Sequence, residues 1–474
     1  MTGAVAELIG EQATESEPAS GERSPAGRGA LFGWVLFDWA QQPVFTLVTT
    51  FLFAPYFANV FVGDPVQGQA IWGYATAIAG LIVALTSPVM GAMADATGRR
   101  KPWILVFSVL LVIGSAMLWS AAPGAQNLLW LVVGGFILAT VAVESQTVFL
   151  NAMMPALVPS SQLGRLSGIG WAVGYVGGLV SLVIMAGFIV TDPASGKTLL
   201  GLDPVIHLDA ESRQADRLVG PFSAVWFILF AIPFFFFTPD QGVRARAGIR
   251  AGIDNLVQTI SHVWSYKNIL TFLLARMLYI DGLLAIFAFG GIYGASIFNW
   301  QPLELGLFGI VLTIAGTIGA VAGGFLDDLV GPKPVITVAL VLLIAATLGI
   351  VSVDANHIMF TNEVAGAAPG DGLFASTPER FYLLLACVVG IVAGPIQTAS
   401  RSLMARLAPP EKITQFFGLF AFSGKITSFI APLVVGLVTQ ATNSQRLGIS
   451  VTIAFLIAGL IVFQRVETTS TARR

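Results

Sequence analysis

Charged side chains are scarce in this sequence. Of its 474 residues only 11% are Asp, Glu, Lys or Arg, while 55% are hydrophobic. Soluble globular domains carry about 25% charged residues, so this composition excludes an ordinary soluble domain and indicates a polytopic membrane protein. The net charge of −2 comes without a basic patch interleaved with aromatics, so no nucleic-acid partner is expected.

Cysteine and histidine are nearly absent as well. The single cysteine, Cys387, excludes an intramolecular disulfide and a multi-cysteine metal site. The three histidines have no ligand-like spacing. No phosphate-binding loop, Walker pattern or nucleophile motif stands out, so the sequence predicts neither an enzyme nor an ATP-driven pump, and no metal or cofactor.

The N-terminal stretch 1–30 lacks the basic and apolar regions of a signal peptide. Small polar residues dominate it, and we expect a disordered cytosolic tail there, with a second short cytosolic tail at 466–474.

Twelve apolar runs are long enough to cross a bilayer. A span needs about 20 predominantly apolar residues, and a helix satisfies its own backbone groups in lipid. The predicted spans are 31–61, 70–94, 103–122, 127–153, 165–190, 220–238, 267–298, 303–326, 334–353, 380–406, 414–440 and 446–464.

Lysines and arginines orient these spans. With the N-terminus inside, 17 of the 24 fall in cytosolic segments and five in outer ones, while Arg276 and Lys425 lie within spans. The positive-inside rule then predicts that both termini are cytosolic. Short loops without a targeting segment favour a bacterial inner membrane.

The segment between spans six and seven has a helical apolar period from Ile249 to Trp264, with arginines upstream. This pattern is typical of an amphipathic helix on a membrane surface. We therefore expect an N-terminal six-helix bundle at 31–240, a cytosolic linker helix at 241–266 and a C-terminal six-helix bundle at 267–465.

The two halves repeat each other. The stretches "NAMMPALVPSSQLGRLSG" (151–168) and "RSLMARLAPPEKITQFFG" (401–418) align without gaps at an offset of 250. A second echo joins "GAMADATGRRKP" (91–102) to "GFLDDLVGPKP" (324–334) at an offset of 233. Two six-helix halves in the same orientation indicate an all-α transporter built from parallel repeats, with its site near the midplane.

A compact motif follows the second span and consists of Gly91, Asp95, Gly98, Arg99 and Arg100. Its spacing resembles the G-x-x-x-D-x-x-G-R-R/K loop motif of the major facilitator superfamily. The resemblance implies the twelve-helix major facilitator fold, in which this motif acts as a conformational latch. The alternative is a basic loop that only signals topology.

Within that superfamily the chain resembles the vacuole-effluxer branch, the autophagy-related amino-acid effluxers. The similar stretches are "FDWAQQPVFTLVTTFLFAPYF" (37–57), "LGRLSGIGWAVGYVGG" (163–178), "ARMLYIDGLLAIFAFGGIY" (275–293) and "RSLMARLAPPEKITQFFGLFAFSGKITSF" (401–429). Gln41, Gln42 and Pro43 depart from the small residues of the branch pattern. The resemblance implies amino-acid export.

Polar and ionisable residues interrupt the spans, and such residues are candidates for a transport site because their burial in lipid is costly. On the first span Asp38, Gln41 and Gln42 are predicted to share one helical face. The full set of cavity candidates is Asp38, Gln41, Gln42, Glu144, Thr147, Arg276, Tyr279, Asp281, Gln397 and Lys425. The alternative is a structural network of buried ion pairs. Arg401 and Arg406 are expected to extend to the cytosolic surface.

These features predict a monomeric secondary active transporter of a small polar solute, with an amino acid or related zwitterion leading by resemblance. A proton is the expected coupling ion and sodium the alternative, and the lipid bilayer and the small-molecule substrate are the expected partners. An ion-coupled sugar symporter and a lipid or glycolipid flippase are alternative functions, and a non-transporting membrane sensor is a third.

Overall fold

The computed structural model describes residues 26–191, 195–240, 249–261, 263–300, 302–366 and 372–468. Twelve helices in these ranges are long and apolar enough to cross a membrane. They coincide with the predicted spans to within a few residues, as in 28–61 against the predicted 31–61. The tail at 1–25, the linker residues 241–248 and the end at 469–474 lie outside the described residues.

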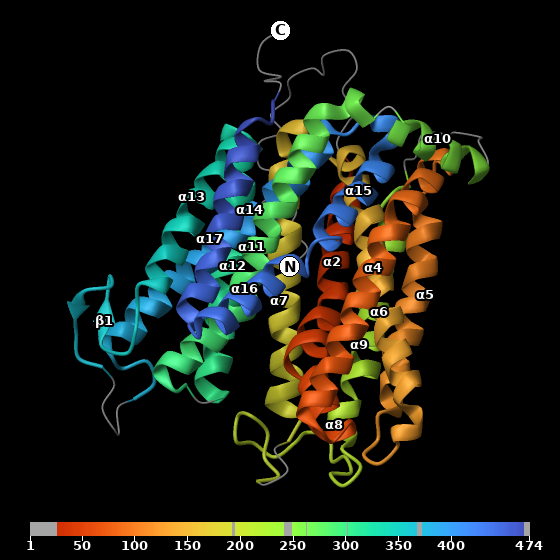
Figure 1. The fold of residues 1–474 in the computed structure, drawn as a ribbon. Coiled ribbons are helices and arrows are strands. Elements are labelled where there is room, and N and C mark those ends of the chain that lie inside the picture. Colours follow the sequence, from red (N-terminus) through yellow and green to blue (C-terminus); the bar gives the residue numbers. More distant parts are fainter. Residues whose placement is uncertain are drawn as a thin grey trace. The chain divides into compact units, whose positions relative to one another are not determined.

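By their contacts the residues group into two units (Figure 1). Unit 1 comprises 1–160, 173–256 and 409–421, and unit 2 comprises 161–172, 257–408 and 422–474. The boundary therefore runs through three helices, α7 (Leu163–Phe188), α10 (Ile249–Ser261) and α15 (Ile413–Lys425). The start of α7 packs in unit 2, and the start of α15 packs in unit 1. The proposed division at 240 and 267 stays a prediction.

Unit 1 is helical throughout, with short π- and 3-10 segments marked η. Besides parts of α7 and α15, its elements are α2 (Arg28–Pro43), η1 (Val44–Phe51), α3 (Phe53–Tyr56), η2 (Phe57–Phe61), α4 (Pro65–Thr97), α5 (Lys101–Met117), η3 (Leu118–Ser120), η4 (Gln126–Leu128), α6 (Leu129–Leu157), α8 (Gln214–Arg217), α9 (Val219–Phe237), α10 (Ile249–Ser261, all but its last residues) and η7 (Pro410–Lys412). The turn η5 (Ser160–Gln162) crosses the boundary.

Unit 2 holds the remaining helices and the one small sheet of the described chain. Its elements are η6 (Val263–Tyr266), α11 (Lys267–Phe298), α12 (Pro302–Val330), α13 (Pro332–Val351), β1 (His357–Ile358), β2 (Asn362–Glu363), α14 (Thr377–Leu407), α16 (Ile430–Thr442) and α17 (Gln445–Gln464). The strands β1 and β2 pair antiparallel in the loop between α13 and α14.

Capping residues mark several helix ends. The Asp64 carboxylate accepts the main-chain N–H groups of Val66 and Gln67 and so caps α4, with Pro65 in the first turn. Ser376 and Glu379 form a reciprocal capping box at the start of α14. Gly98 ends α4 with φ 71°, a left-handed conformation that favours glycine.

The first span is not a regular α-helix. After Pro43 it widens into the π-helix η1, and the N–H of Leu52 donates to the carbonyl of Leu47 at 3.0 Å. Pro55 has no N–H and its ring opposes the preceding turn, so the helical ladder rearranges on its N-terminal side. The widened turns begin directly after the polar stretch from Asp38 to Gln42.

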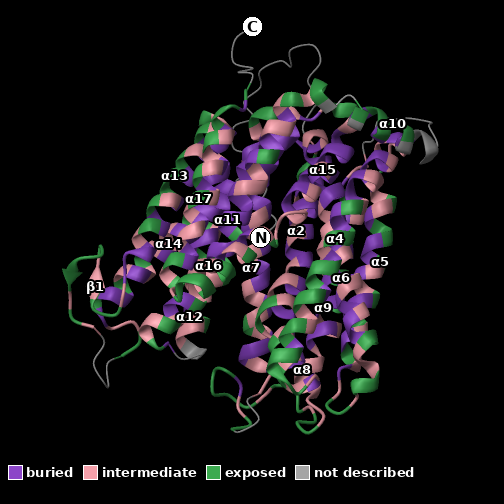
Figure 2. Cartoon of the chain, in the orientation of Figure 1, coloured by how far each residue is buried: buried purple, intermediate pink, exposed green. Residues whose placement is uncertain are grey.

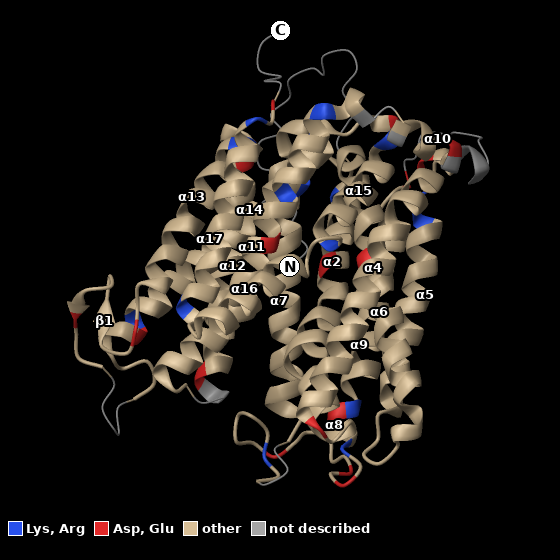
Figure 3. Ribbon diagram, viewed as in Figure 1, with Lys and Arg blue, Asp and Glu red and all other residues tan. Residues whose placement is uncertain are grey.

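The outer faces of the helices are apolar and exposed, as a lipid-facing surface requires. On α5, Leu105, Val106 and Val109 are all more than half exposed (Figure 2). Lys, Arg, Asp and Glu gather toward helix ends, and the middles of the helices carry few of them (Figure 3). Those few intramembrane charges are the natural place to look for a site.

Candidate functional site

The polar face of the first span lies against glycines of α7 inside unit 1. A Cβ on Gly174 would lie 3.6 Å from the Asp38 Cβ and 3.5 Å from the Gln42 Oε1. A Cβ on Gly178 would lie 2.7 Å from the Gln42 Cγ. The glycines thus bring the α7 backbone onto Asp38 and Gln42, and both side chains remain half-buried.

Gln41 faces a different neighbour from the one that we expected. Its Nε2 donates to the Oε1 of Gln146 on α6 at 2.8 Å, and the Gln146 Nε2 donates to the Ser108 hydroxyl at 3.0 Å. Gln41 is 3% exposed and Gln146 is fully buried. The prediction that Asp38, Gln41 and Gln42 share one face therefore holds for Asp38 and Gln42, while Gln41 belongs to a buried amide chain.

On α6, Glu144 and Thr147 are half-buried. The Thr147 hydroxyl donates to the carbonyl of Val143 at 3.0 Å and lies 3.4 Å from the Gln41 Oε1. Asp38, Gln42, Glu144 and Thr147 are thus partly accessible groups of unit 1. Their roles in a site stay predictions.

In unit 2, the middle of α11 carries one cation, Arg276, and one anion, Asp281. The Arg276 Nη1 donates to the Ser423 hydroxyl at 3.0 Å, and its guanidinium lies against Gly424, where a Cβ would come within 2.8 Å of Nη1. Asp281 is 2% exposed. Its polar neighbours are the Thr427 hydroxyl and, through charge, Arg276.

The other candidate residues of unit 2 differ in how deeply they are buried. Tyr279 is fully buried, and its hydroxyl hydrogen-bonds the Ser400 hydroxyl at 2.7 Å. Gln397 on α14 and Lys425 at the end of α15 are half-buried. The geometry therefore brings Arg276, Asp281 and Lys425 near the same stretch of the eleventh span, and Tyr279 packs away from solvent.

Arg401 corrects one expectation. It does not extend to the surface but is 3% exposed, and its Nε donates to the Ser167 hydroxyl at 2.8 Å. Its guanidinium also lies 6.0 Å from the ring of Trp171. A cation can be buried here because hydroxyl and carbonyl oxygens at the start of α7 accept its hydrogen bonds.

The latch motif makes its contacts with the start of α15, inside unit 1. The Asp95 carboxylate accepts the main-chain N–H groups of Thr414 at 3.1 Å and Gln415 at 2.8 Å. Arg100 is buried, with its Nε donating to the Thr414 hydroxyl at 2.8 Å and its Nη2 lying 3.5 Å from Asp95. A carboxylate at a helix N-terminus is stabilised by free N–H groups and by the helix dipole.

The remaining motif residues differ in role. Arg99 is exposed, whereas Gly98 supplies the left-handed turn and Gly91 lies under the backbone of Thr414. Asp240 was not predicted. Its carboxylate accepts the N–H groups of Arg100 and Lys101, both at 3.1 Å, and so caps α5.

The same contact is built a second time, inside unit 2. The Asp328 carboxylate accepts the N–H groups of Gly164 at 2.8 Å and Arg165 at 3.1 Å. At the offset of 233 Asp95 corresponds to Asp328, and at the offset of 250 Gly164 corresponds to Thr414. The two sequence echoes therefore meet each other in the structure, each aspartate capping the helix that the other echo begins.

The match extends to the glycines beneath both contacts. Gly91 lies against the Thr414 carbonyl, and its counterpart Gly324 lies against the Gly164 carbonyl. Gly418 packs on the Ser87 carbonyl, and Gly168 packs on the Ala320 carbonyl in the same way. Every one of these pairs keeps the offsets of 233 and 250.

One cluster has no counterpart. In unit 2, Asp327 is buried and pairs with the Arg406 Nη2 at 3.0 Å, and it also accepts from the Ser402 hydroxyl. At the same two offsets the equivalent positions in the first half are Ala94, Ala152 and Ala156. The second contact thus carries an extra ion pair where the first has three alanines.

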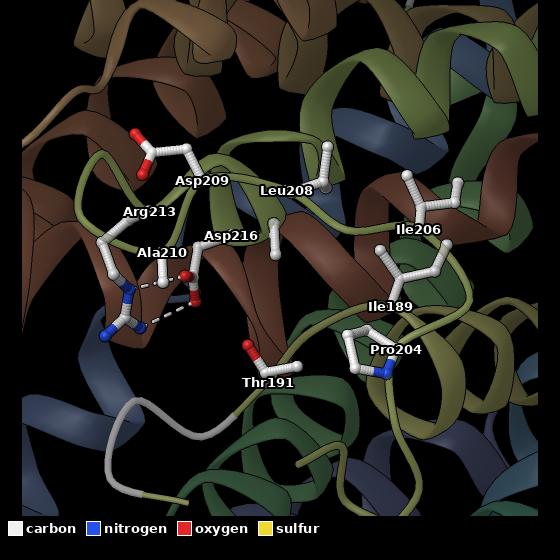
Figure 4. Close-up of a pocket in the computed structure, with 10 residues that line it drawn as sticks. Ile189, Thr191, Pro204, Ile206, Leu208, Asp209, Ala210, Arg213 and Asp216 are labelled. Carbon is white, nitrogen blue, oxygen red and sulfur yellow. Dashed lines mark hydrogen bonds and ion pairs between the residues drawn. The ribbon is translucent and has the colours of Figure 1, made fainter. Parts of the chain in front are cut away.

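One hollow of unit 1 lies away from these groups. It measures about 350 Å³ and is formed by the loop after α7 and by α8, with Ile189, Ile206 and Leu208 on its apolar side (Figure 4). Arg213 and Asp216 at its edge are already paired at 2.7 Å. It is therefore a loop crevice and no part of the intramembrane site.

Twelve apolar spans, ionisable groups inside them and a twice-built contact define a membrane transporter of the major facilitator superfamily. Solved structures share the fold. The Escherichia coli fucose:proton symporter FucP superposes with a TM-score of 0.68 at 15% identity, over 93% of this chain and 98% of that one. The human organic anion transporter MFSD10 superposes with a TM-score of 0.67 at 14% identity, over 93% and 100%.

The family can be stated as well. The family described as "Vacuole effluxer Atg22 like" matches residues 57–474, and the chain belongs to that family. The predicted fold and branch are confirmed, and the protein is a transporter rather than an enzyme.

Two relatives set the scale of similarity. An uncharacterized MFS-type transporter of Bacillus subtilis, YxiO, is 26% identical over 92% of this chain and 95% of its own length. Autophagy-related protein 22-1 of Neosartorya fischeri is 24% identical over 63% of this chain. The match spans about half of that fungal protein, 46% of its length.

Proposed function

We propose that this protein is a secondary active transporter of a small polar solute, with an amino acid or related zwitterion as the leading substrate class and export as its direction. The observation that supports this substrate class is the pair of opposite charges on α11. Arg276 and Asp281 are five residues apart, a rise of about 7.5 Å along the helix, and they meet different residues of the eleventh span, Arg276 at Ser423 and Asp281 at Thr427. The two charges thus stand at separate levels of the helix, as the two ends of a zwitterion require.

The chemistry of the groups fits this proposal. Arg276 or Lys425 can hold a substrate carboxylate, because guanidinium and ammonium groups donate charge-assisted hydrogen bonds. Asp38 or Glu144 can hold a substrate ammonium or carry a coupling proton, and both are partly accessible within unit 1. We propose proton coupling, with sodium as the alternative ion.

Alternating access would use the two carboxylate contacts. Asp95 holds residues 409–421 within unit 1 and Asp328 holds residues 161–172 within unit 2. We propose that these contacts form when one side of the transporter is closed and are released when that side opens. Main-chain N–H groups and carboxylates regain water partners on release, so the exchange need not cost much free energy.

We further propose a bacterial inner-membrane location with both termini cytosolic and a monomer as the transporting species. The distribution of Lys and Arg along the chain supports the orientation. The bacterial relative of matching length supports the membrane type.

Counterflow in proteoliposomes tests the proposal. Vesicles containing the purified protein are loaded with one unlabelled solute, and uptake of the same labelled solute is followed for a panel of amino acids, sugars and lysolipids, with and without a pH or sodium gradient. We expect counterflow for at least one amino acid and faster flux with a gradient. Counterflow of sugars or lipids alone would show that the proposed substrate class is wrong. No counterflow of any tested solute would contradict transport.

A further inference from the structure

The eleventh span is interrupted within its length. The helix α15 ends at Lys425 and α16 begins at Ile430, and the residues between them are not helical. In the turn, the Ser428 N–H donates to the Lys425 carbonyl at 3.3 Å and the Ile430 N–H to the Thr427 carbonyl at 2.7 Å. Lipid tolerates such backbone only where protein or a cavity surrounds it, and interrupted helices in transporters mark ion and substrate sites.

Two charged residues of α11 flank the interruption at successive levels. Arg276 contacts Ser423 and Gly424 in the last turn of α15, where the helix dipole is negative. Asp281 lies beside Thr427, in the interruption and ahead of the first turn of α16. Ser423 and Thr427 are four residues apart in the eleventh span. The α11 residues beside them, Arg276 and Asp281, are five residues apart.

Asp281 is incompletely satisfied. It is 2% exposed, and its Oδ1 has no hydrogen-bond partner among the described residues. The Thr427 hydroxyl is its polar side-chain neighbour, yet that oxygen too lacks a partner with hydrogen-bond geometry in the described chain. Buried polar atoms in native proteins are nearly always paired, so two adjacent unpaired oxygens point to a group that fits between them.

We propose that Asp281 and Thr427, at the break that follows the C-terminal end of α15, form a subsite for a small monovalent cationic group. The C-terminal end of α15 adds negative partial charge to that of Asp281 through the helix dipole. The group is either the ammonium of a zwitterionic substrate or a sodium ion, since both need several oxygen ligands at once. This inference rests on the proposed transport of a small polar solute and assigns one end of it.

The test measures ligand-dependent melting of the full-length protein purified in detergent. One arm compares NaCl with choline chloride at equal ionic strength, and identifies sodium. The other arm, in choline chloride, compares amino acids with their N-acetyl derivatives, which lack the ammonium. The variants are Asp281→Asn and Thr427→Val, and Thr442→Val is the matched control, because its hydroxyl only bonds the Val438 carbonyl on an exposed face.

We expect sodium or an amino acid, but not its N-acetyl derivative, to raise the melting temperature of the wild-type protein and of Thr442→Val. Asp281→Asn should weaken the apparent affinity at least tenfold, and Thr427→Val should weaken it less. If Asp281→Asn does not melt cooperatively, Thr427→Val decides. Wild-type affinity in both variants, or no response of the wild type to either cation, would overturn the subsite.

Counterflow separates this inference from the proposed function. Flux of an amino acid in the wild type with undiminished binding and flux in both variants leaves transport standing and removes the subsite. Cation binding that Asp281→Asn abolishes, without flux of any tested solute, supports the subsite and removes the transport proposal.

Discussion

Asp95 and Asp328 each cap the first turn of a distant helix, and they do so at equivalent positions of the two sequence repeats. Asp95 receives the N–H groups of Thr414 and Gln415, and Asp328 those of Gly164 and Arg165. The offsets of 233 and 250 that relate the echoes also relate these contacts residue by residue. The repeat in the sequence therefore corresponds to the same set of hydrogen bonds formed once in each unit.

A methyl group at Gly91 should disrupt the first contact. In Gly91→Ala the new Cβ would overlap the Thr414 carbonyl, so the start of α15 must shift, at a cost of about 1–3 kcal/mol. Gly80 on the same helix has nothing within 4 Å of a Cβ and provides the matched control. We expect a lower melting temperature in detergent for Gly91→Ala and an unchanged or higher one for Gly80→Ala. Equal melting of the two variants would contradict the close approach.

Removing Arg406 should destabilise the protein strongly, because it leaves the buried Asp327 without its cation. Loss of one partner of a buried pair costs about 3–5 kcal/mol, and the partial exposure of Arg406 favours the lower end. The triple variant Asp327→Ala, Ser402→Ala, Arg406→Ala copies the alanines at the equivalent positions of the first half. Its melting temperature should return toward that of the wild type. A triple variant as unstable as Arg406→Ala would show that the ion pair itself is required.

The two neighbouring glutamines should respond differently to substitution. Gln41→Leu leaves the Oε1 of the buried Gln146 without its donor, and an unpaired buried polar group costs about 1–3 kcal/mol. Gln42→Leu removes a half-buried amide that contacts α7 and should change flux or substrate selectivity with less effect on melting. The measurements are melting temperature and initial counterflow rate. Similar losses of stability in both variants would show that Gln42 also has a structural role.

Asp38→Asn tests the coupling role of the first span. Asparagine keeps the shape of the side chain and removes its charge and its exchangeable acid proton, so a proton carrier at this position loses its function. We expect counterflow to persist while flux driven by a pH gradient is lost. Flux with wild-type dependence on pH in this variant would remove Asp38 from the coupling path.

The positions of the spans could be predicted from composition and periodicity. A helix that crosses the membrane needs about 20 predominantly apolar residues, and such runs are visible in the sequence. The repeat was also readable, since its glycines and aspartates serve backbone contacts that allow few other residues. Asp328 already stood at the position of Asp95 in the second echo. What an alignment could not supply is that each echo contacts the other, because that depends on which helices pack together.

The side-chain directions were harder to predict. The helical period groups Gln41 and Gln42 on one face, and which of them meets α6 and which meets α7 depends on partners that lie more than 100 residues away. The burial of Arg401 depends similarly on Ser167. The interruption after Lys425 precedes Pro432 in the first turn of α16, whose missing N–H and whose ring disfavour a continuous helix through Ser428. What the sequence does not show is that Arg276 of α11 lies against Gly424, directly before the interruption.

The capping contacts of Asp95 and Asp328 have an evolutionary consequence. Their donors are main-chain N–H groups, which every residue except proline supplies, so substitutions at Thr414 or Gly164 leave the donors in place. Mutations can therefore change the strength of each contact mainly at the aspartate itself and at the charged residues beside it. Asp327 and Arg406 are one such adjustment, present in only one of the two copies. After a duplication, two such positions could diverge by single steps and make the two contacts unequal without rebuilding the fold.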